Sequence, residues 1–216
     1  YSADEFLRFT TIKEDGILLE EGVRLAQYFE AFGVDAINVS SGTYDSANRN
    51  LQPMSYEQGC NVYLTEEVKK AVSIPVFAVG VIREPAFADQ IIAEGRTDYV
   101  CIGRGLLADP EWANKAMQGR EDDIRPCISC LHCMETLTTS STKAEKGKLH
   151  QTECAVNTRT GFELTYNNLR KDGAGRVVAI IGGGPSGMEA ARVLAEREFK
   201  PVLFEKKSLL GGQLQL

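Results

Sequence analysis

Four cysteines lie close together in the second half of the chain. Cys127, Cys130 and Cys133 form a C-x2-C-x2-C pattern, and Cys154 follows after a longer loop. Thiolates at this spacing converge on one soft metal centre, because a turn of backbone points them the same way and a fourth thiolate closes the tetrahedron. An iron–sulfur cluster and a structural zinc ion both use four thiolates, so the spacing alone does not choose between them.

A glycine-rich turn follows the cysteines at a distance. An apolar run, Arg176–Ile181, leads into G-x-G-x-x-G and then into a helical pattern over Met188–Arg197. In this motif Gly182 permits the tight turn, Gly184 lets a pyrophosphate approach the backbone, and Gly187 allows close packing of the helix. The alternative is a glycine-rich turn that binds nothing.

The segment after this helix favours a dinucleotide site over a bare turn. A second apolar run, Pro201–Phe204, ends in Glu205, about 20 residues after the glycines, where an acid accepts hydrogen bonds from ribose hydroxyls. Gln213 follows Gly211 and Gly212, and this loop is expected to return to the same ligand.

A third set of residues occurs at or within short apolar runs in the first half. Gly80, Gly103 and Arg104 come just after two such runs, where the loops of a barrel commonly hold a phosphate. Arg8 and Asn38 lie within two earlier runs and are placed to point toward the ring of a bound flavin. Singly, these residues are typical of turns and solvated charges. Together they favour a flavin phosphate site.

The elements that would position these residues alternate between strand and helix. Strand-helix alternation builds a parallel sheet, either as a barrel or as an open doubly wound sheet. A barrel needs eight such units and four are found here, so a closed barrel would require further units upstream. The predicted strands are Phe6–Thr10, Ala36–Ser40, Pro75–Gly80 and Tyr99–Gly103.

The predicted helices have recognisable starts and ends. Gly33 ends the first helix, Thr65 caps the second, Pro85 and Gly95 bound the third, and Asp109-Pro110-Glu111 opens a fourth that closes near Gly119. The chain from 127 to about 171 is predicted to be irregular, with an exposed loop over 138–148.

Composition narrows the class of protein. With 43% hydrophobic and 25% charged residues the chain is ordinary globular protein, and a formal charge of −6 argues against a nucleic-acid partner. No apolar run is long enough for a membrane span and no signal segment is visible, so we expect a cytoplasmic protein without disulfides and without a membrane partner. A homo-oligomer is compatible with the sequence, which leaves the oligomeric state open.

The motifs, in this order, resemble the old yellow enzyme family. The resemblance is closest to its iron–sulfur branch, which includes 2,4-dienoyl-CoA reductases, trimethylamine dehydrogenase and clostridial enoate or bile-acid enone reductases. It runs over essentially the whole chain, and the matching stretches are 6–10, 35–42, 75–80, 102–104 with 108–110, 124–130, 154–157 and 182–187.

The resemblance implies three parts. Residues 1–122 would be the C-terminal half of an FMN-binding (β/α)8 barrel, residues 123–172 a four-cysteine [4Fe–4S] segment with a linker, and residues 173–216 the start of a Rossmann-like FAD/NAD(P)-binding domain. It further implies that the four cysteines ligate the cluster. The residues implied to contact FMN are Arg8, Gly103 and Arg104, and those implied to contact FAD are Gly184, Glu205 and Gln213.

This chain departs from the family pattern at three places. Tyr44 stands where dienoyl-CoA reductases carry a histidine proton donor, and a phenol can donate to a developing enolate or merely line the pocket. Val81 replaces an arginine after the third strand, which leaves one FMN phosphate contact to the backbone. The loop before Cys154 is an insertion.

The implied activity is an NAD(P)H-dependent reduction of the C=C bond of an α,β-unsaturated carbonyl compound. NAD(P)H would reduce FAD, single electrons would pass through the cluster to FMN, and reduced FMN would deliver hydride to the β-carbon. The alternative enzyme is an amine dehydrogenase, in which electrons would pass from the substrate through FMN to the cluster. A zinc-stapled module that binds nucleotide without catalysis is the alternative from another class.

Overall fold

The computed structural model describes residues 1–12, 15–142 and 151–214, with side chains omitted for 139–142. These residues form two compact units, Tyr1–Gly161 and Phe162–Leu216. Most of the cysteine segment packs with the first unit. The predicted three-part division, which separates the residues by function, stays a prediction.

The first unit is built on a parallel sheet of three strands, β1 (Ile37–Val39), β2 (Val76–Val79) and β3 (Tyr99–Cys101). The strands lie in chain order, with Val39 beside Ala78 and Val79 beside Cys101. Three of the four predicted strands are therefore confirmed. Neighbouring strands in chain order with helices between them fit the winding of a (β/α)8 barrel, and the barrel is not closed within this chain.

The first predicted strand, Phe6–Thr10, is wrong. This stretch forms a 3-10 turn, η1 (Leu7–Phe9), and Phe6 before it has a left-handed backbone with φ 53°. The carboxylate of Asp4 accepts the backbone N–H of Phe6 at 2.8 Å, which curls the chain where a strand would extend it. The position beside β1 is occupied instead by residues 1–3, where Ser2 forms a parallel bridge with the residue after β1.

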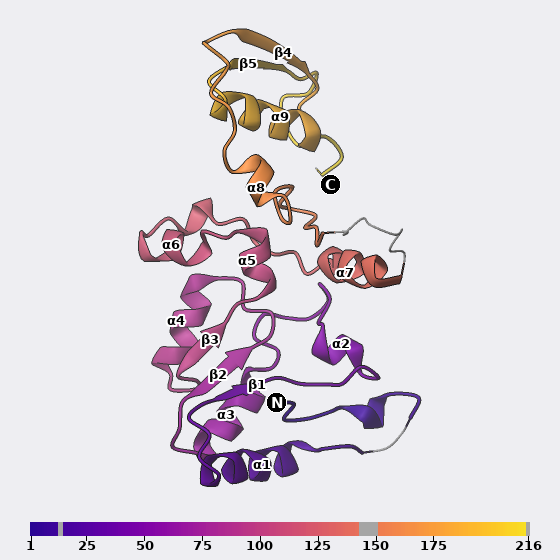
Figure 1. The fold of residues 1–216 in the computed structure, drawn as a ribbon, viewed down its shortest axis with the longest axis vertical. Helices are drawn as coiled ribbons and strands as arrows, with labels where there is room; N and C mark the ends of the chain where they lie inside the picture. The colour runs from indigo at the N-terminus through magenta and orange to yellow at the C-terminus, as the bar shows by residue number, and fades with distance from the viewer. Residues whose placement is uncertain (13–14, 143–150, 215–216) are drawn as a thin grey trace. The chain divides into compact units, whose positions relative to one another are not determined.

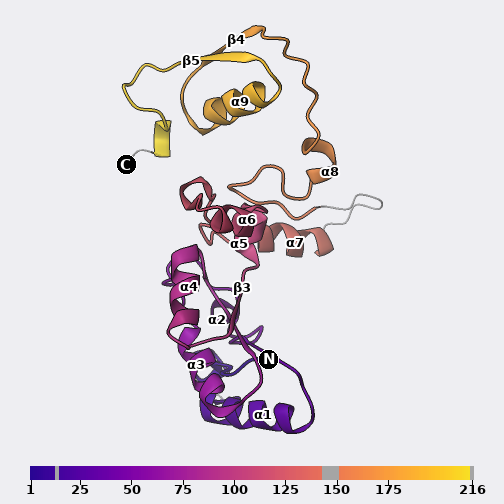
Figure 2. The same ribbon diagram turned by 90° about the vertical axis from the view of Figure 1, so that its left-hand side faces the viewer.

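Three long helices accompany the sheet (Figures 1 and 2): α1 (Leu19–Ala31), α3 (Val62–Ala71) and α4 (Pro85–Ala93). Helix α3 packs on β1 and β2, α4 packs on β3, and α1 packs against α3. The predicted start of α4 at Pro85 is confirmed, and the glycines after α1 and α4 have positive φ as helix ends require.

The predicted helix cap at Thr65 is wrong. Helix α3 begins at Val62, with Asn61 at the cap position four residues before Thr65, so Thr65 is an interior helical residue. Its side chain is fully buried. The turn that starts the helix is made by the backbone of Val62, whose N–H donates to the carbonyl of Gly59 at 2.8 Å.

Shorter helices follow β1 and β3. They are α2 (Ala47–Asn50), α5 (Arg104–Ala108), α6 (Trp112–Met117), η2 (Glu121–Asp123) and α7 (His132–Thr142). The predicted opening of α6 is confirmed, since Asp109 accepts the backbone N–H of Glu111 at 3.1 Å. Helix α7 corrects the prediction of an irregular segment from 127 onward. The predicted exposed loop lies mostly at 143–148, outside the described residues.

Two apolar clusters hold the first unit together. One joins β1 and β2 to α1 and α3, and its fully buried members include Leu64, Val68 and Val76. The other joins β2 to α4 and α6 around Ile91 and Trp112. Full burial of one such aliphatic side chain contributes about 1.5–3 kcal/mol, so these clusters fix the carboxyl ends of the strands relative to one another.

The second unit contains α8 (Glu163–Tyr166), β4 (Val177–Ile181), α9 (Pro185–Glu196), β5 (Lys200–Phe204) and η3 (Gly212–Leu214). Strands β4 and β5 pair in parallel and α9 packs on them, which confirms the predicted strand-turn-helix-strand unit. The strand β4 is not buried, however: Ile181 is 83% exposed, because no other described residue covers that face of the sheet. None of the helices in the described parts of the chain is long and apolar enough to cross a membrane.

Candidate functional site: a cavity beside the cysteine loop

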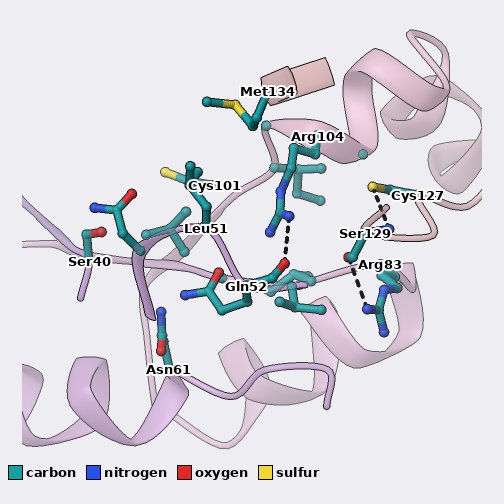
Figure 3. A pocket seen from close by; sticks show the side chains of 18 residues that line it. Ser40, Leu51, Gln52, Asn61, Arg83, Cys101, Arg104, Cys127, Ser129 and Met134 are labelled. Carbon is teal, nitrogen blue, oxygen red and sulfur yellow. Dashed lines mark hydrogen bonds between the residues drawn. The ribbon is translucent and has the colours of Figure 1, made fainter. Parts of the chain in front are cut away.

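A cavity of about 190 Å³ opens in the first unit where β1, β2 and β3 end (Figure 3). The carboxyl ends of parallel strands meet at one edge of a sheet, which is where barrel enzymes place their active sites. The residues that line the cavity come from the loops after the three strands, from the loop after α2 and from the cysteine segment. They are Ser40, Asn50–Gln52, Asn61, Val79–Arg83, Cys101–Gly105, Cys127, Ser129 and Met134.

The three residues predicted to hold a flavin phosphate all line this cavity. A Cβ on Gly103 would meet nothing within 4 Å, so space for a ligand is open beside its backbone. Arg104 donates from Nη1 to the carbonyl of Gln52 at 2.8 Å, which holds its guanidinium across the cavity. Gly80 has φ 128°, and a Cβ there would lie 2.8 Å from the side chain of Asn61. These features fit an anionic cofactor.

Arg83 is a cavity residue that the sequence analysis missed. It lies two positions after Val81, so the cavity gains a guanidinium that position 81 lacks. Its Nη2 donates to the Ser129 hydroxyl of the cysteine loop at 3.1 Å, while its Nε is buried without a hydrogen-bond partner among the described residues. Val81 itself has a left-handed backbone with φ 49°, a strained state for a β-branched residue that clusters at functional sites. An arginine within three residues of a strand-end glycine is the signal that could have identified it.

Three other predicted residues lie elsewhere. The Arg8 guanidinium forms two hydrogen bonds of 3.0 Å with the Asp4 carboxylate, and Arg8 does not line the cavity. Asn38 lies in β1 and donates to the Cys101 sulfur at 3.3 Å. Tyr44 is fully exposed and outside the cavity lining. The placement of Arg8 within a strand was wrong, and the roles of Arg8 and Tyr44 stay predictions.

The cysteine loop has a backbone suited to presenting thiolates. Ser129 and Leu131 both have left-handed φ, 52° and 61°, so the chain turns sharply between Cys127 and Cys133. The backbone N–H of Ser129 donates to the Cys127 sulfur at 3.4 Å (Figure 3). Hydrogen bonds of this kind stabilise a thiolate and tune an iron–sulfur centre.

The fourth cysteine returns to the helix that carries the third. The backbone N–H of Glu153 donates to the Thr136 hydroxyl of α7 at 3.1 Å, which brings Cys154 back toward Cys133. Burial raises the pKa of the Cys133 thiol, and the neighbouring Cys127 and Cys154 thiols raise it further. Cys130 is exposed.

All four thiols are free, and as a donor set they fit an iron–sulfur cluster or zinc. Within the described residues, no three Cys, His, Asp or Glu side chains are gathered at metal-binding geometry. The ligand set of Cys127, Cys130, Cys133 and Cys154 therefore stays a prediction.

Partly buried polar contacts fix the cysteine segment to α5, the helix that follows β3. The Asp109 carboxylate accepts the backbone N–H of Arg125 at 2.9 Å and the Lys115 ammonium at 2.6 Å. Burial works against ionisation, but these hydrogen bonds hold the pKa of Asp109 below its usual range. Farther along, the Asn157 amide and the Thr160 hydroxyl both donate to the carbonyl of Leu107 in α5, at 2.9 and 2.8 Å.

The glycine-rich turn of the second unit fits a bound phosphate. Gly182 has φ 103°, which favours glycine, and a Cβ on Gly182 or Gly184 would meet nothing within 4 Å. A Cβ on Gly187 would lie 2.0 Å from the carbonyl oxygen of Gly182. The first two glycines therefore leave space for a ligand, while the third permits the helix to pack against the turn.

Glu205 and the following loop return to this turn. The Glu205 carboxylate accepts backbone N–H groups from Gly183 at 2.7 Å and from Lys207 at 2.8 Å, and these lower its pKa. Each carboxylate oxygen keeps a further lone pair for a ribose hydroxyl. The N–H of Gly211 donates to the carbonyl of Gly183 at 2.8 Å, and Gln213 follows in η3 with an exposed side chain.

A parallel strand-helix unit with a cavity at the ends of its strands, followed by a dinucleotide-type turn, is typical of flavin-dependent oxidoreductases. Residues 6–123 match the NADH:flavin oxidoreductase / NADH oxidase family, and residues 180–215 match an NAD(P)-binding Rossmann-like domain. The chain belongs to the NADH:flavin oxidoreductase / NADH oxidase family. The resemblance to the iron–sulfur branch of the old yellow enzymes is confirmed.

The chain spans about a third of the length of its relatives. It is 46% identical to an NADH oxidase of Thermoanaerobacter brockii, covering 100% of this chain and 31% of that protein. It is 38% identical to a cinnamate reductase of Clostridium sporogenes, covering 94% of this chain and 29% of that protein. The solved structure of 6-hydroxypseudooxynicotine amine oxidase from Pseudomonas geniculata aligns with a TM-score of 0.81 at 26% identity, covering 99% of this chain and 30% of that one.

Proposed function

We propose that the full-length protein is an NAD(P)H-dependent flavin and iron–sulfur oxidoreductase that reduces the C=C bond of an α,β-unsaturated carbonyl compound. The observation that carries the proposal is the cavity at the carboxyl ends of β1–β3, lined both by Gly103 and Arg104 and by Cys127 and Ser129. The residues proposed to hold the flavin and the cysteine loop thereby line the same cavity. The similarity to a cinnamate reductase supports reduction of an enoate.

Each part of the site has a role in this proposal. Arg104 and the open backbone at Gly103 would hold the FMN phosphate, and Arg83 would join the cavity to the cysteine loop through Ser129. FMN, when bound, supplies hydride transfer, and an iron–sulfur cluster supplies one-electron transfer. Tyr44 is proposed as the proton donor to the α-carbon, and FAD with NAD(P)H is assigned to the turn at Gly182–Gly187.

Anaerobic turnover of the full-length protein tests this proposal. NADH or NADPH should be oxidised with cinnamate, an enoyl-CoA or a steroid enone, and the saturated product should form. The alternative is an amine dehydrogenase, which the similarity to the amine oxidase supports. It would be established if an amine reduced a dye and no enone caused oxidation of NADH or NADPH. A colourless protein that contains zinc and no flavin would overturn both.

A further inference from the structure

We infer that Arg49 binds an anionic group of the substrate, so that the enzyme is specific for negatively charged unsaturated compounds. This inference rests on the proposed function and adds the charge of the substrate to it. Arg49 is the third residue of α2, and the next three residues, Asn50, Leu51 and Gln52, line the cavity. Arg49 itself does not line the cavity, but its backbone adjoins the three residues that do.

The backbone around Arg49 is fixed at the carboxyl end of β1. The Ser41 hydroxyl donates to the Arg49 carbonyl at 2.8 Å, and the Gln52 amide donates to the same oxygen. The Ser46 hydroxyl, just before α2, donates to the carbonyl of Glu5 at 2.6 Å. These contacts hold the short helix in place against the first residues of the chain.

The guanidinium of Arg49 is placed by aromatic rings. Its central carbon lies 4.6 Å from the ring centre of Phe6, 5.5 Å from that of Tyr56 and 5.9 Å from that of Phe9. A stacked guanidinium keeps the N–H groups at its edge available, and these form a planar fork that matches a carboxylate. Arg49 is half-buried, so the stacking restricts its side chain before a ligand binds.

The neighbouring arginine is neutralised and Arg49 is not. Arg8 shares the rings of Phe6 and Phe9 with Arg49, but it is paired with the buried carboxylate of Asp4. That carboxylate also accepts the N–H of Phe6. Within the described ranges no carboxylate forms an ion pair with Arg49. One positive charge on α2, next in sequence to residues that line the cavity, thus lacks a counter-charge.

This arrangement disfavours a cationic substrate. Proteins that bind ammonium groups through aromatic side chains need ring faces free to receive the cation. Here the guanidinium groups of Arg8 and Arg49 lie over Phe6 and Phe9, and Arg49 also lies over Tyr56. An amine would meet rings that are already occupied and an uncompensated like charge, whereas a carboxylate or phosphate would supply the missing counter-ion.

The test measures binding to the full-length, flavin-loaded protein by equilibrium dialysis. The ligands are aryl and alkyl enoates of increasing length, each paired with its uncharged amide, together with phenethylamine. We expect the wild type to prefer at least one enoate over its amide by about 10- to 100-fold, as for a hydrogen bond to a charged group. Arg49→Met should abolish this preference and leave amide binding unchanged, and Arg49→Lys should keep part of it.

A matched control and turnover separate the possible failures. Arg120→Met removes an exposed arginine that pairs with Asp123 away from the cavity, and it should not alter the preference. The flavin content of each variant shows that the site has folded. Equal affinity for acid and amide, a preference that survives Arg49→Met, or tighter binding of the amine would overturn the inference. If the protein reduces enoates but its preference for enoate over amide does not depend on Arg49, only this inference is refuted. If Arg49→Met loses that preference but the wild type reduces no enoate, only the proposed function is refuted.

Discussion

Replacement of Asp109 by asparagine should loosen the joint between α5 and the cysteine loop. Asp109 is 5% exposed, and one of its oxygens accepts both the Arg125 N–H and the Lys115 ammonium, while the other accepts the Glu111 N–H. Asp109→Asn keeps the last contact but places an NH2 group against the other two donors. Hydrogen bonds to a charged group contribute about 1.5–3 kcal/mol each.

We expect the loss of free energy to lie at the lower end of the sum for the two lost hydrogen bonds. Lys115 is 19% exposed and keeps a hydrogen bond of 2.9 Å to the carbonyl of Asp123, so its charge is not left bare. We therefore expect local opening to become easier by about 3 kcal/mol. This corresponds to amide hydrogen exchange about 150-fold faster over residues 103–130 of the full-length protein.

Asp123→Asn is the matched control for this substitution. It removes a carboxylate that pairs with Arg120 at 2.9 Å but is 57% exposed, and an exposed pair contributes at most about 1 kcal/mol. Exchange measured by mass spectrometry should separate the two variants clearly. If Asp109→Asn exchanges no faster than Asp123→Asn over this segment, the joint does not depend on Asp109 and the reasoning is refuted.

The same carboxylate sets a pH dependence. Its pKa in the folded protein is lower than in the unfolded chain, so its stabilising contribution is complete above the unfolded value and is lost as the pH falls through the folded one. The difference in stability between wild type and Asp109→Asn should therefore be complete at neutral pH. The two proteins should converge below about pH 4, near the ordinary pKa of aspartate. A difference that grows on acidification would contradict this assignment.

Two further predictions concern the cofactor sites. Gly187→Ala should lower the free energy of unfolding of the second unit by about 1–3 kcal/mol, because the added Cβ would overlap the glycine-rich turn. Gly184→Ala should leave that stability unchanged and lower FAD retention, and loss of stability in both variants alike would argue against a ligand at Gly184. Arg104→Gln should reduce retention of FMN about tenfold or more on gel filtration, while Arg120→Gln should not; equal retention would remove Arg104 from the phosphate site.

Much of the fold followed from local patterns in the sequence. The runs that became β1, β2 and β3 are short, apolar and bounded by turn residues, and each signal is contained within a few neighbours. Phe6–Thr10 has the same composition, but there the nearby carboxylate of Asp4 captures the backbone and bends it. A side chain that competes with the sheet for backbone hydrogen bonds overrides an apolar pattern.

The candidate site was predictable where the position after a strand or the spacing of cysteines carried the signal. Gly103 was predicted from its place just after an apolar run and Cys127 from the cysteine spacing, and both line one cavity. Arg83 and Arg49 were missed because their roles depend on contacts between distant parts of the chain. Arg83 meets a serine 46 positions later, and Arg49 stacks on Phe6, so neither contact is visible as a spacing along the sequence.

The central claim is that the four cysteines carry an iron–sulfur cluster beside a flavin cavity. The most direct measurement is the content of iron, acid-labile sulfide, zinc and flavin in the full-length protein purified without oxygen. The account predicts about four iron and four sulfide for each FMN, with the iron lost in Cys133→Ser. Stoichiometric zinc in place of iron, or iron content unchanged by Cys133→Ser, would contradict it.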